Sequence, residues 1–407
     1  MNKNKILYLS YDGLTDQLSK SQIIPYLNIL SNLFSVFVLT CEKKNKLMDY
    51  LPIKKHLLEK NKIICKKIYF TKKKYLFIFS KLFDFLKIFI LSAIIIKKNH
   101  IKIVHCRGHI PAFIIFFLKL FFNVKLIFDY RGMWIEERID MNVINLSSNK
   151  GKIINYLLKK IETKTIRSSH KIIVLTNSMK KFIINKYNIN KDDIFVIPCY
   201  VNINTFQLRD YKNINIRNEL KINSKSKIIC YLGSVSGMYL IEEMLDFFVY
   251  LKKKFNNYYF LFITNNILEL DKILKNKNYN EYKEYIKIKS LEFEQVPKYL
   301  SQVNLSICFL KNSIARMGTF PIKFAETLAM GIPQIYNSKI GDFDLIFKNN
   351  KIGAIIDITN KSNINKIIND FTTIENLNKT MIQKYALENF SIDKANEKYI
   401  NVYKKLI

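Results

Sequence analysis

Phe320–Asp344 has the sequence FPIKFAETLAMGIPQIYNSKIGDFD and combines helix, strand and loop signals in one short segment. Pro321 fits the first position of a helix, where a missing N–H costs nothing, and Gly331 is placed to end that helix. The pattern then predicts a short strand, Gln334–Asn337, and a second loop at Gly341–Asp342. A helix that leads into a short apolar strand is typical of an α/β fold.

Two charged residues of this predicted helix, Lys323 and Glu326, are three positions apart and therefore share one helix face. A lysine there suits a pyrophosphate, and a glutamate suits a diol such as a ribose. The helix N-terminus itself favours an anion. The spacing allows two interpretations, a nucleotide site or an ordinary surface helix with an ion pair.

Working outward, short apolar runs alternate with helical patterns such as 21–32 along most of the chain. Continuous apolar strands separated by helices favour parallel sheets covered on both faces. A polar stretch at 202–227 interrupts the alternation and indicates a linker. The predicted strands are 5–10, 35–40, 65–69, 103–106, 125–129, 171–175 and 194–197 before it, and 227–232, 258–263, 285–289, 305–309, 334–337 and 354–358 after it.

Five segments, spread over nearly the whole chain and in the same order, resemble glycosyltransferase family 4, the retaining group 1 enzymes with the GT-B fold. They are Tyr11–Leu27, Phe128–Glu137, Ile172–Met179, Val196–Phe206 and Phe320–Asp344. The resemblance implies an α/β GT-B architecture, with two doubly wound Rossmann-like domains whose parallel sheets face each other across a cleft. We expect an acceptor-binding domain at 1–205, a nucleotide-sugar-binding domain at 206–390, and a C-terminal helix at 391–407 that crosses back to the first domain.

Charge and cysteine usage exclude some classes of protein. The 407 residues carry a formal net charge of +33, which an AT-rich genome explains but which also attracts anionic surfaces. The lysines are scattered, and no zinc-finger or helix-turn-helix pattern supports a nucleic-acid partner. The six cysteines form no C-x-x-C pair, so they are expected to be small buried residues of a reducing compartment, without a metal site.

No signal peptide and no membrane span are expected from the sequence. The segment 75–96 is apolar and aromatic, but Lys81, Asp84 and Lys87 interrupt it, and lysines flank it on both sides. This pattern fits either a domain helix with a polar outer face or a helix that lies on an anionic membrane surface. The protein is therefore expected to be cytoplasmic, either free or peripheral on the inner face of the cytoplasmic membrane.

Polar loops follow several predicted strands of the first half, and each has a structural alternative as a turn, a cap or an ion pair. Arg107 suits a phosphate or a carboxylate. Asp129 and Glu137 suit an acceptor hydroxyl, and Trp134, the only tryptophan, suits a sugar face. With the resemblance, the expected acceptor-binding residues are Asp12, Gly13, Arg107, Arg131, Trp134 and Glu137.

In the second half, the loop Gly233–Gly237 follows a predicted strand and offers backbone N–H groups to a phosphate. The resemblance implies that Arg316 and Lys323 supply its positive charge. The family's paired acids stand eight positions apart, and the first would fall at Gly318, where it is missing. The expected donor-binding residues are Gly233, Ser234, Gly237, Arg316, Lys323, Glu326, Gly341 and Asp342. The expected catalytic residues are Arg316, Lys323, Glu326 and Asp129.

The resemblance implies a metal-independent, retaining glycosyltransferase that uses no cofactor. Its donor is a nucleoside-diphosphate sugar and its acceptor a glycan or a lipid-linked glycan, in cell-surface polysaccharide or lipopolysaccharide biosynthesis. Two alternatives stay open: a nucleotide-sugar epimerase of the same architecture, and a catalytically inactive GT-B binding protein, which the missing acid at Gly318 favours.

Overall fold

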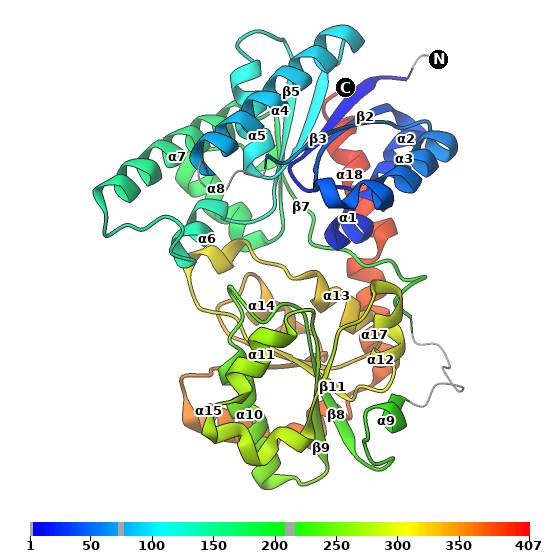
Figure 1. Cartoon of the computed structure of the whole chain (residues 1–407), viewed down its shortest axis with the longest axis vertical. Helices are drawn as coiled ribbons and strands as arrows, with labels where there is room; N and C mark the ends of the chain where they lie inside the picture. Colours follow the sequence, from blue (N-terminus) through cyan, green and yellow to red (C-terminus); the bar gives the residue numbers. More distant parts are fainter. Residues whose placement is uncertain (1–2, 72–76, 208–215) are drawn as a thin grey trace. The chain divides into compact units, whose positions relative to one another are not determined.

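The computed structural model describes residues 3–71, 77–207 and 216–407 (Figure 1). The chain forms two compact units. Unit 1 comprises Met1–Pro198 together with Ile392–Ile407, and unit 2 comprises Cys199–Ser391. Each unit is built on one parallel sheet with interleaved helices, which confirms the predicted α/β class with two doubly wound units.

The sheet of unit 1 has seven strands in the order β3-β2-β1-β4-β5-β6-β7, all paired in parallel. Strands β1, β2, β4, β5 and β6 are almost continuously buried, as expected when helices cover both faces of a parallel sheet, whereas the edge strand β3 mixes buried and exposed residues. Their bounds are β1 Lys5–Ser10, β2 Ser35–Glu42, β3 Ile64–Tyr69, β4 Ile103–Arg107, β5 Lys125–Tyr130, β6 Lys171–Val174 and β7 Ile194–Val196.

The helices of unit 1 lie on both faces of this sheet. After β1 the chain adds β2 and β3 on one side, and it then crosses to the other side of β1 to add β4. Because crossovers between parallel strands are right-handed, the helices of these two sets of connections lie on opposite faces. On one face α2 packs against β2, and on the other α4 packs against β1 and β3, and α5 against β4 and β5. Their bounds are α1 Gln17–Gln22, α2 Ile24–Leu33, α3 Leu47–Asn61, α4 Phe77–Asn99, α5 His109–Leu118, α6 Trp134–Asp140, α7 Asn149–Ser168, α8 Asn177–Tyr187 and α18 Ile392–Lys404.

One helix boundary differs from the sequence-based expectation. The single helix predicted at 21–32 is two helices that meet at Ile23. Pro25 lies in the first turn of α2, where its missing N–H is tolerated. In the middle of a longer helix the same proline would lose a hydrogen bond and clash with the preceding turn.

The sheet of unit 2 has six parallel strands in the order β10-β9-β8-β11-β12-β13. The strands are β8 Lys227–Leu232, β9 Tyr258–Ile263, β10 Ile286–Lys289, β11 Leu305–Cys308, β12 Gln334–Asn337 and β13 Gly353–Ile356. The helices are α9 Ile216–Glu219, α10 Ile241–Lys254, α11 Ile267–Leu274, α12 Val296–Leu300, α13 Ile322–Ala329, α14 Phe343–Asn349, α15 Lys361–Asn369, α16 Phe371–Glu375 and α17 Lys379–Phe390.

Both sheets reverse their strand order beside the first strand, between β1 and β4 in unit 1 and between β8 and β11 in unit 2. In open α/β sheets, ligands bind beyond the carboxyl ends of the strands at such switch points. The loops that follow these four strands are therefore the places where each unit is expected to hold a ligand.

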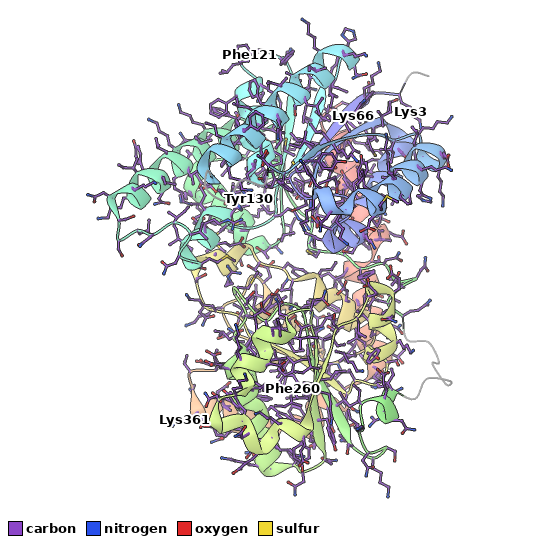
Figure 2. The ribbon with its side chains drawn as sticks, in the orientation of Figure 1. Lys3, Lys66, Phe121, Tyr130, Phe260 and Lys361 are labelled. Carbon is purple, nitrogen blue, oxygen red and sulfur yellow. The ribbon has the colours of Figure 1, made fainter. Side chains whose placement is uncertain are left out.

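Each unit has its own apolar core. In Figure 2 the labelled Tyr130 and Phe260 lie within the two units, and both are fully buried, whereas Lys3, Lys66, Phe121 and Lys361 lie at the periphery. All six cysteines are buried thiols. Among the described residues, no helix is both long enough and apolar enough to cross a membrane.

Candidate functional site

The helix α13 presents Lys323 and Glu326 in unit 2, and both side chains are nearly buried, with 8% and 6% of their surfaces exposed. The helix begins at Ile322, not at Pro321 as predicted. The φ angle of Pro321, −66°, fits either position, but its ψ of 134° makes it the N-cap residue. Gly331 ends the helix as expected, with a φ of +69°.

The ammonium group of Lys323 is held between two tyrosines. Its Nζ donates a hydrogen bond to Tyr231 Oη at 3.2 Å, and it lies 3.7 Å from the centre of the Tyr239 ring and 4.5 Å from that of Tyr231. Aromatic faces stabilise a cation at such distances. Because Tyr231 comes from β8 and Tyr239 from the loop that follows it, the positive charge is fixed at the carboxyl end of β8.

The position of this lysine requires a residue without a side chain at Gly233, the first residue after β8. A Cβ atom at Gly233 would lie 2.2 Å from Lys323 Nζ, and its φ of +137° disfavours any other residue. The loop continues through Ser234, which is exposed, and its Oγ lies 3.1 Å from Asn266 Oδ1. Gly237, also exposed, has a φ of +80°. The expected Gly233–Gly237 loop and Lys323 therefore form one cluster.

Arg316 joins this cluster from the 3₁₀ helix η6 (Ile314–Gly318). Its side chain is 1% exposed, and Nη1 donates to the sulfur of Met238, which belongs to the loop after β8. Its carbonyl oxygen accepts the N–H of Gly341 at 2.9 Å, and Asp342 follows as the N-cap residue of α14. The structure thus brings the predicted donor-side loops together through Arg316.

Burial is the main influence on Glu326. It raises the pKa of this carboxyl from 4.5 to about 7, against the opposing effect of the Lys323 charge. Among the described residues, the carboxyl group accepts no hydrogen bond from the protein. A buried acceptor without a protein donor is suited to a ligand that brings its own hydroxyl donors.

In unit 1, Asp129 at the end of β5 is a fully buried carboxylate that faces two guanidinium groups and an imidazole. Arg131 Nη1, Arg107 Nη1 and His105 Nε2 each lie 3.5 Å from one of its oxygens. Burial acts to raise the pKa of Asp129, but the charges of Arg131 and Arg107 and the contact with His105 hold it below its usual range. Tyr403 Oη of α18 lies 2.9 Å from His105 Nδ1. Asp129 therefore orients the two arginines and is itself screened from solvent.

A cavity of about 250 Å³ opens beside this cluster, within unit 1. Five of the six residues expected on the acceptor side line it, namely Asp12, Arg107, Arg131, Trp134 and Glu137. Burial raises the pKa of Asp12, more than the nearby Arg107 lowers it. The cavity therefore combines guanidinium groups, carboxyl groups and an indole ring, which is a surface suited to a sugar that carries polar substituents.

The sixth residue, Gly13, does not line this cavity. A Cβ atom there would lie 2.5 Å from Oε2 of Glu42, the last residue of β2. Glu42 is buried and accepts hydrogen bonds from Leu14 N at 2.7 Å and from Thr15 Oγ1 at 2.9 Å. The loop after β1 closes tightly against this carboxylate, so the lack of a side chain at Gly13 has a structural reason.

The sequence analysis did not identify the tyrosine pair around Lys323, and it did not place His109 among the expected site residues, although His109 lines the cavity. Tyr231 is the fifth residue of an apolar strand and is 92 positions from the lysine it binds. A tyrosine near the carboxyl end of a predicted strand is the one signal that points toward a site. Among the described residues, no group of three histidine, cysteine or acidic side chains is arranged to hold a metal ion.

Two doubly wound units with polar clusters at their switch points define a protein of the GT-B class. Residues 34–205 match the family model described as Glycosyltransferase Family 4, and residues 212–387 match the model described as Glycosyl transferases group 1. The chain belongs to this group of glycosyltransferases, as its sequence motifs predicted. A comparison with curated protein sequences finds no match.

Solved structures of low sequence identity share the fold over nearly the full length. A glycosyltransferase from Rickettsia africae is 17% identical, with a TM-score of 0.68 and coverage of 99% of this chain and 98% of that one. Anabaena HepE in complex with UDP and glucose is 12% identical, with a TM-score of 0.69 and coverage of 98% and 99%. A putative UDP-N-acetylglucosamine 2-epimerase from Listeria monocytogenes is 13% identical, with a TM-score of 0.60 and coverage of 98% and 96%.

Proposed function

We propose that the protein transfers a sugar from a nucleoside-diphosphate sugar to a glycan or lipid-linked acceptor, with retention of the anomeric configuration, in cell-surface polysaccharide or lipopolysaccharide biosynthesis. The observation that carries this proposal is the Lys323 ammonium group, fixed by two tyrosines against Gly233. A cation held beside a glycine-rich loop at a strand end binds a diphosphate. HepE, a structural neighbour, is solved with UDP and glucose, which supports the same kind of donor.

In this proposal the catalytic task is mainly electrostatic. Lys323 and Arg316 stabilise the negative charge that grows on the leaving diphosphate as the glycosidic bond breaks. Glu326, one turn further along α13, accepts hydrogen bonds from the ribose hydroxyls. Since two cationic side chains already supply the positive charge, transfer requires neither a metal ion nor a cofactor.

The acceptor occupies the cavity of unit 1. Trp134 stacks on a sugar face, while Asp12 and Glu137 accept hydrogen bonds from its hydroxyls. Arg107 and Arg131, oriented by the buried Asp129, contact any acidic group of the acceptor.

Thermal shift with nucleoside diphosphates and their sugars tests the donor side. A nucleotide at about 100 times its dissociation constant stabilises the protein by about 2.7 kcal/mol, and Lys323→Met abolishes most of this stabilisation. Glu326→Gln weakens binding of the nucleotide but not that of inorganic pyrophosphate, which has no ribose. The matched control is Lys348→Met, since Lys348 is an exposed lysine of the neighbouring helix α14.

Product analysis then separates the possible activities. Transfer to a glycan acceptor in the presence of a chelator supports the proposal, and the anomeric configuration of the product tests retention. Inversion of a sugar carbon without an acceptor would identify an epimerase instead, and tight nucleotide binding without turnover would identify an inactive binding protein. Equal stabilisation of the wild type and of Lys323→Met by every nucleotide would refute the proposed donor site.

The helix α4 supports a peripheral position on the inner face of the membrane. Leu82, Leu86, Ile90 and Ile94 form a stripe at i, i+4 spacing, and each is between 46% and 56% exposed. Lysines lie in the last turn of the same helix, at 97 and 98. An exposed apolar stripe with adjacent lysines fits a bilayer that contains anionic lipids.

Sedimentation with phosphatidylglycerol vesicles tests this attachment. The wild type binds them more strongly than phosphatidylcholine vesicles, and the double substitution Leu86→Glu, Ile90→Glu releases it. The control is Leu268→Glu, because Leu268 is 76% exposed on α11 of unit 2. Retention of the double variant on the vesicles would exclude α4 as the attachment site.

A further inference from the structure

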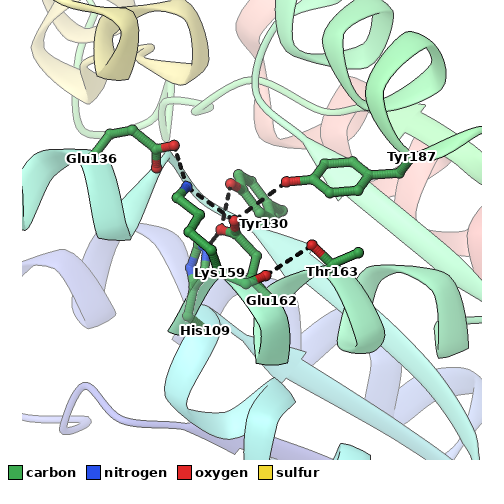
Figure 3. A network of polar contacts seen from close by, with 7 residues as sticks. All are labelled: His109, Tyr130, Glu136, Lys159, Glu162, Thr163 and Tyr187. Carbon is green, nitrogen blue, oxygen red and sulfur yellow. Dashed lines mark hydrogen bonds and ion pairs between the residues drawn. The ribbon is translucent and has the colours of Figure 1, made fainter. Parts of the chain in front are cut away.

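A second buried carboxylate of unit 1, Glu162 of α7, is fully enclosed and has an unusually complete set of donors (Figure 3). Its Oε1 faces His109 Nε2 at 3.0 Å and accepts from Tyr130 Oη at 2.9 Å. Its Oε2 accepts from Lys159 Nζ at 3.2 Å and from Tyr187 Oη at 3.3 Å. Burial acts to raise the pKa of Glu162, but these donors, with His109 foremost, lower it to about 2.

The imidazole that Glu162 holds, His109, belongs to the wall of the acceptor cavity. Its ring stacks on Trp134, with ring centres 5.8 Å apart and planes inclined by 26°. Only 3% of the residue is exposed. Glu162 engages Nε2, whereas Nδ1 has no hydrogen-bond partner within residues 3–71, 77–207 and 216–407.

The ionised carboxylate determines which ring nitrogen carries the proton. A carboxylate accepts but does not donate, so the hydrogen bond to Glu162 requires a proton on Nε2. In the neutral imidazole, Nδ1 then carries a lone pair. A nearly buried acceptor with no protein donor, beside the indole ring of Trp134, needs a donor from a ligand.

We infer that His109, held in this tautomer by Glu162, accepts a hydrogen bond through Nδ1 from a sugar hydroxyl of the acceptor and so selects how the acceptor sits on Trp134. This inference rests on the proposed function, because it assigns the acceptor to the unit 1 cavity. His109 is a binding and specificity-determining residue in this account, and Glu162 is the positioning residue behind it.

Nitrogen NMR of the histidine ring tests the inference directly on the full-length protein. In the wild type, Nε2 of the His109 ring is protonated and Nδ1 is not. Methyl β-glucopyranoside, a probe that carries sugar hydroxyls, shifts the Nδ1 resonance. Inorganic sulfate, which at neutral pH accepts hydrogen bonds but has no hydroxyl to donate, leaves it unchanged.

Glu162→Gln supplies the decisive variant. The amide can donate to Nε2, so the proton moves to Nδ1, the Nδ1 response to the glucoside disappears, and its affinity falls several-fold, up to about tenfold. The matched control is Thr163→Ala, because Thr163 is the next residue of α7 and its hydroxyl donates to the Lys159 carbonyl and not to Glu162. This control behaves as the wild type.

A proton on Nδ1 in the wild type, or a shift caused by sulfate instead of the glucoside, overturns the inference, and neither measurement depends on the folding of a variant. An unchanged glucoside response in Glu162→Gln also overturns it. Nucleotide binding in unit 2 is measured separately. If nucleotides bind through Lys323 and His109 does not respond, this inference alone fails. If no nucleotide binds, the proposed donor site fails.

Discussion

Replacing Glu326 with glutamine is predicted to remove a loss of folding stability that the wild type shows as the pH rises. The folded protein raises the pKa of this carboxyl from 4.5 to about 7, so the folded state binds its proton more tightly than the unfolded state does. The free energy of unfolding therefore falls as the pH rises through this window and stays low above it. A shift of this size, roughly 2.5 pKa units at about 1.4 kcal/mol each, corresponds to about 3.5 kcal/mol.

Thermal denaturation between about pH 5 and about pH 8 measures this effect. Glutamine keeps the shape of the side chain but does not ionise, so Glu326→Gln melts higher than the wild type near pH 8. For a unit of this size the gain is about 7–14 °C, and the two curves converge near pH 5. The control Glu388→Gln removes a carboxylate that is 59% exposed, and it leaves the pH dependence unchanged.

Binding adds a second consequence of the same shift. The ribose diol needs the ionised carboxylate, so nucleotide affinity of the wild type rises with pH up to about 7 and then levels off, whereas that of Glu326→Gln stays flat and lower. Parallel melting curves of Glu326→Gln and the wild type across this range would refute the reasoning. They would mean that burial does not hold the proton on Glu326.

Three further substitutions give separate predictions. Gly233→Ala forces a methyl group against Lys323 Nζ at a φ of +137°. It therefore lowers stability by about 1–3 kcal/mol and abolishes nucleotide-induced stabilisation in thermal shift. Unchanged nucleotide binding would contradict the predicted contact. Asp129→Asn leaves two arginines of unit 1 without their buried counter-charge and costs about 3–5 kcal/mol in urea unfolding; a loss below 1 kcal/mol would show that solvent reaches them. Tyr403→Phe removes the 2.9 Å contact with His105 and costs about 1–3 kcal/mol by the same measurement, whereas an equally stable variant would mean that another donor replaces the phenol.

The fold was predictable because parallel strands buried on both faces appear in the sequence as continuous apolar runs. The observed strands Lys5–Ser10, Lys227–Leu232, Tyr258–Ile263 and Gln334–Asn337 have the predicted bounds. Helix ends were less certain, because the φ of Pro321 fits both the N-cap and the first helical position.

Side-chain contacts between distant elements were not predictable in the same way. The pairs Lys323–Tyr231 and His109–Glu162 join residues 92 and 53 positions apart. Tertiary packing alone brings such residues together, and no local sequence spacing predicts either pair. The sequence predicted the acceptor-side residues in separate loops that follow different strands. These loops share one cavity because the strands end on either side of the switch point of the sheet.

Unit 1 is assembled from two pieces of chain, because α18 contributes Tyr399 and Tyr403 to the aromatic cluster around His105. Unit 2 is one uninterrupted segment between them. During synthesis on the ribosome, all of unit 2 is therefore made before unit 1 is complete. The core of unit 1 closes only after α18 has been made. This reverses the usual order in which domains mature during synthesis, because unit 1 is incomplete until α18 has been made.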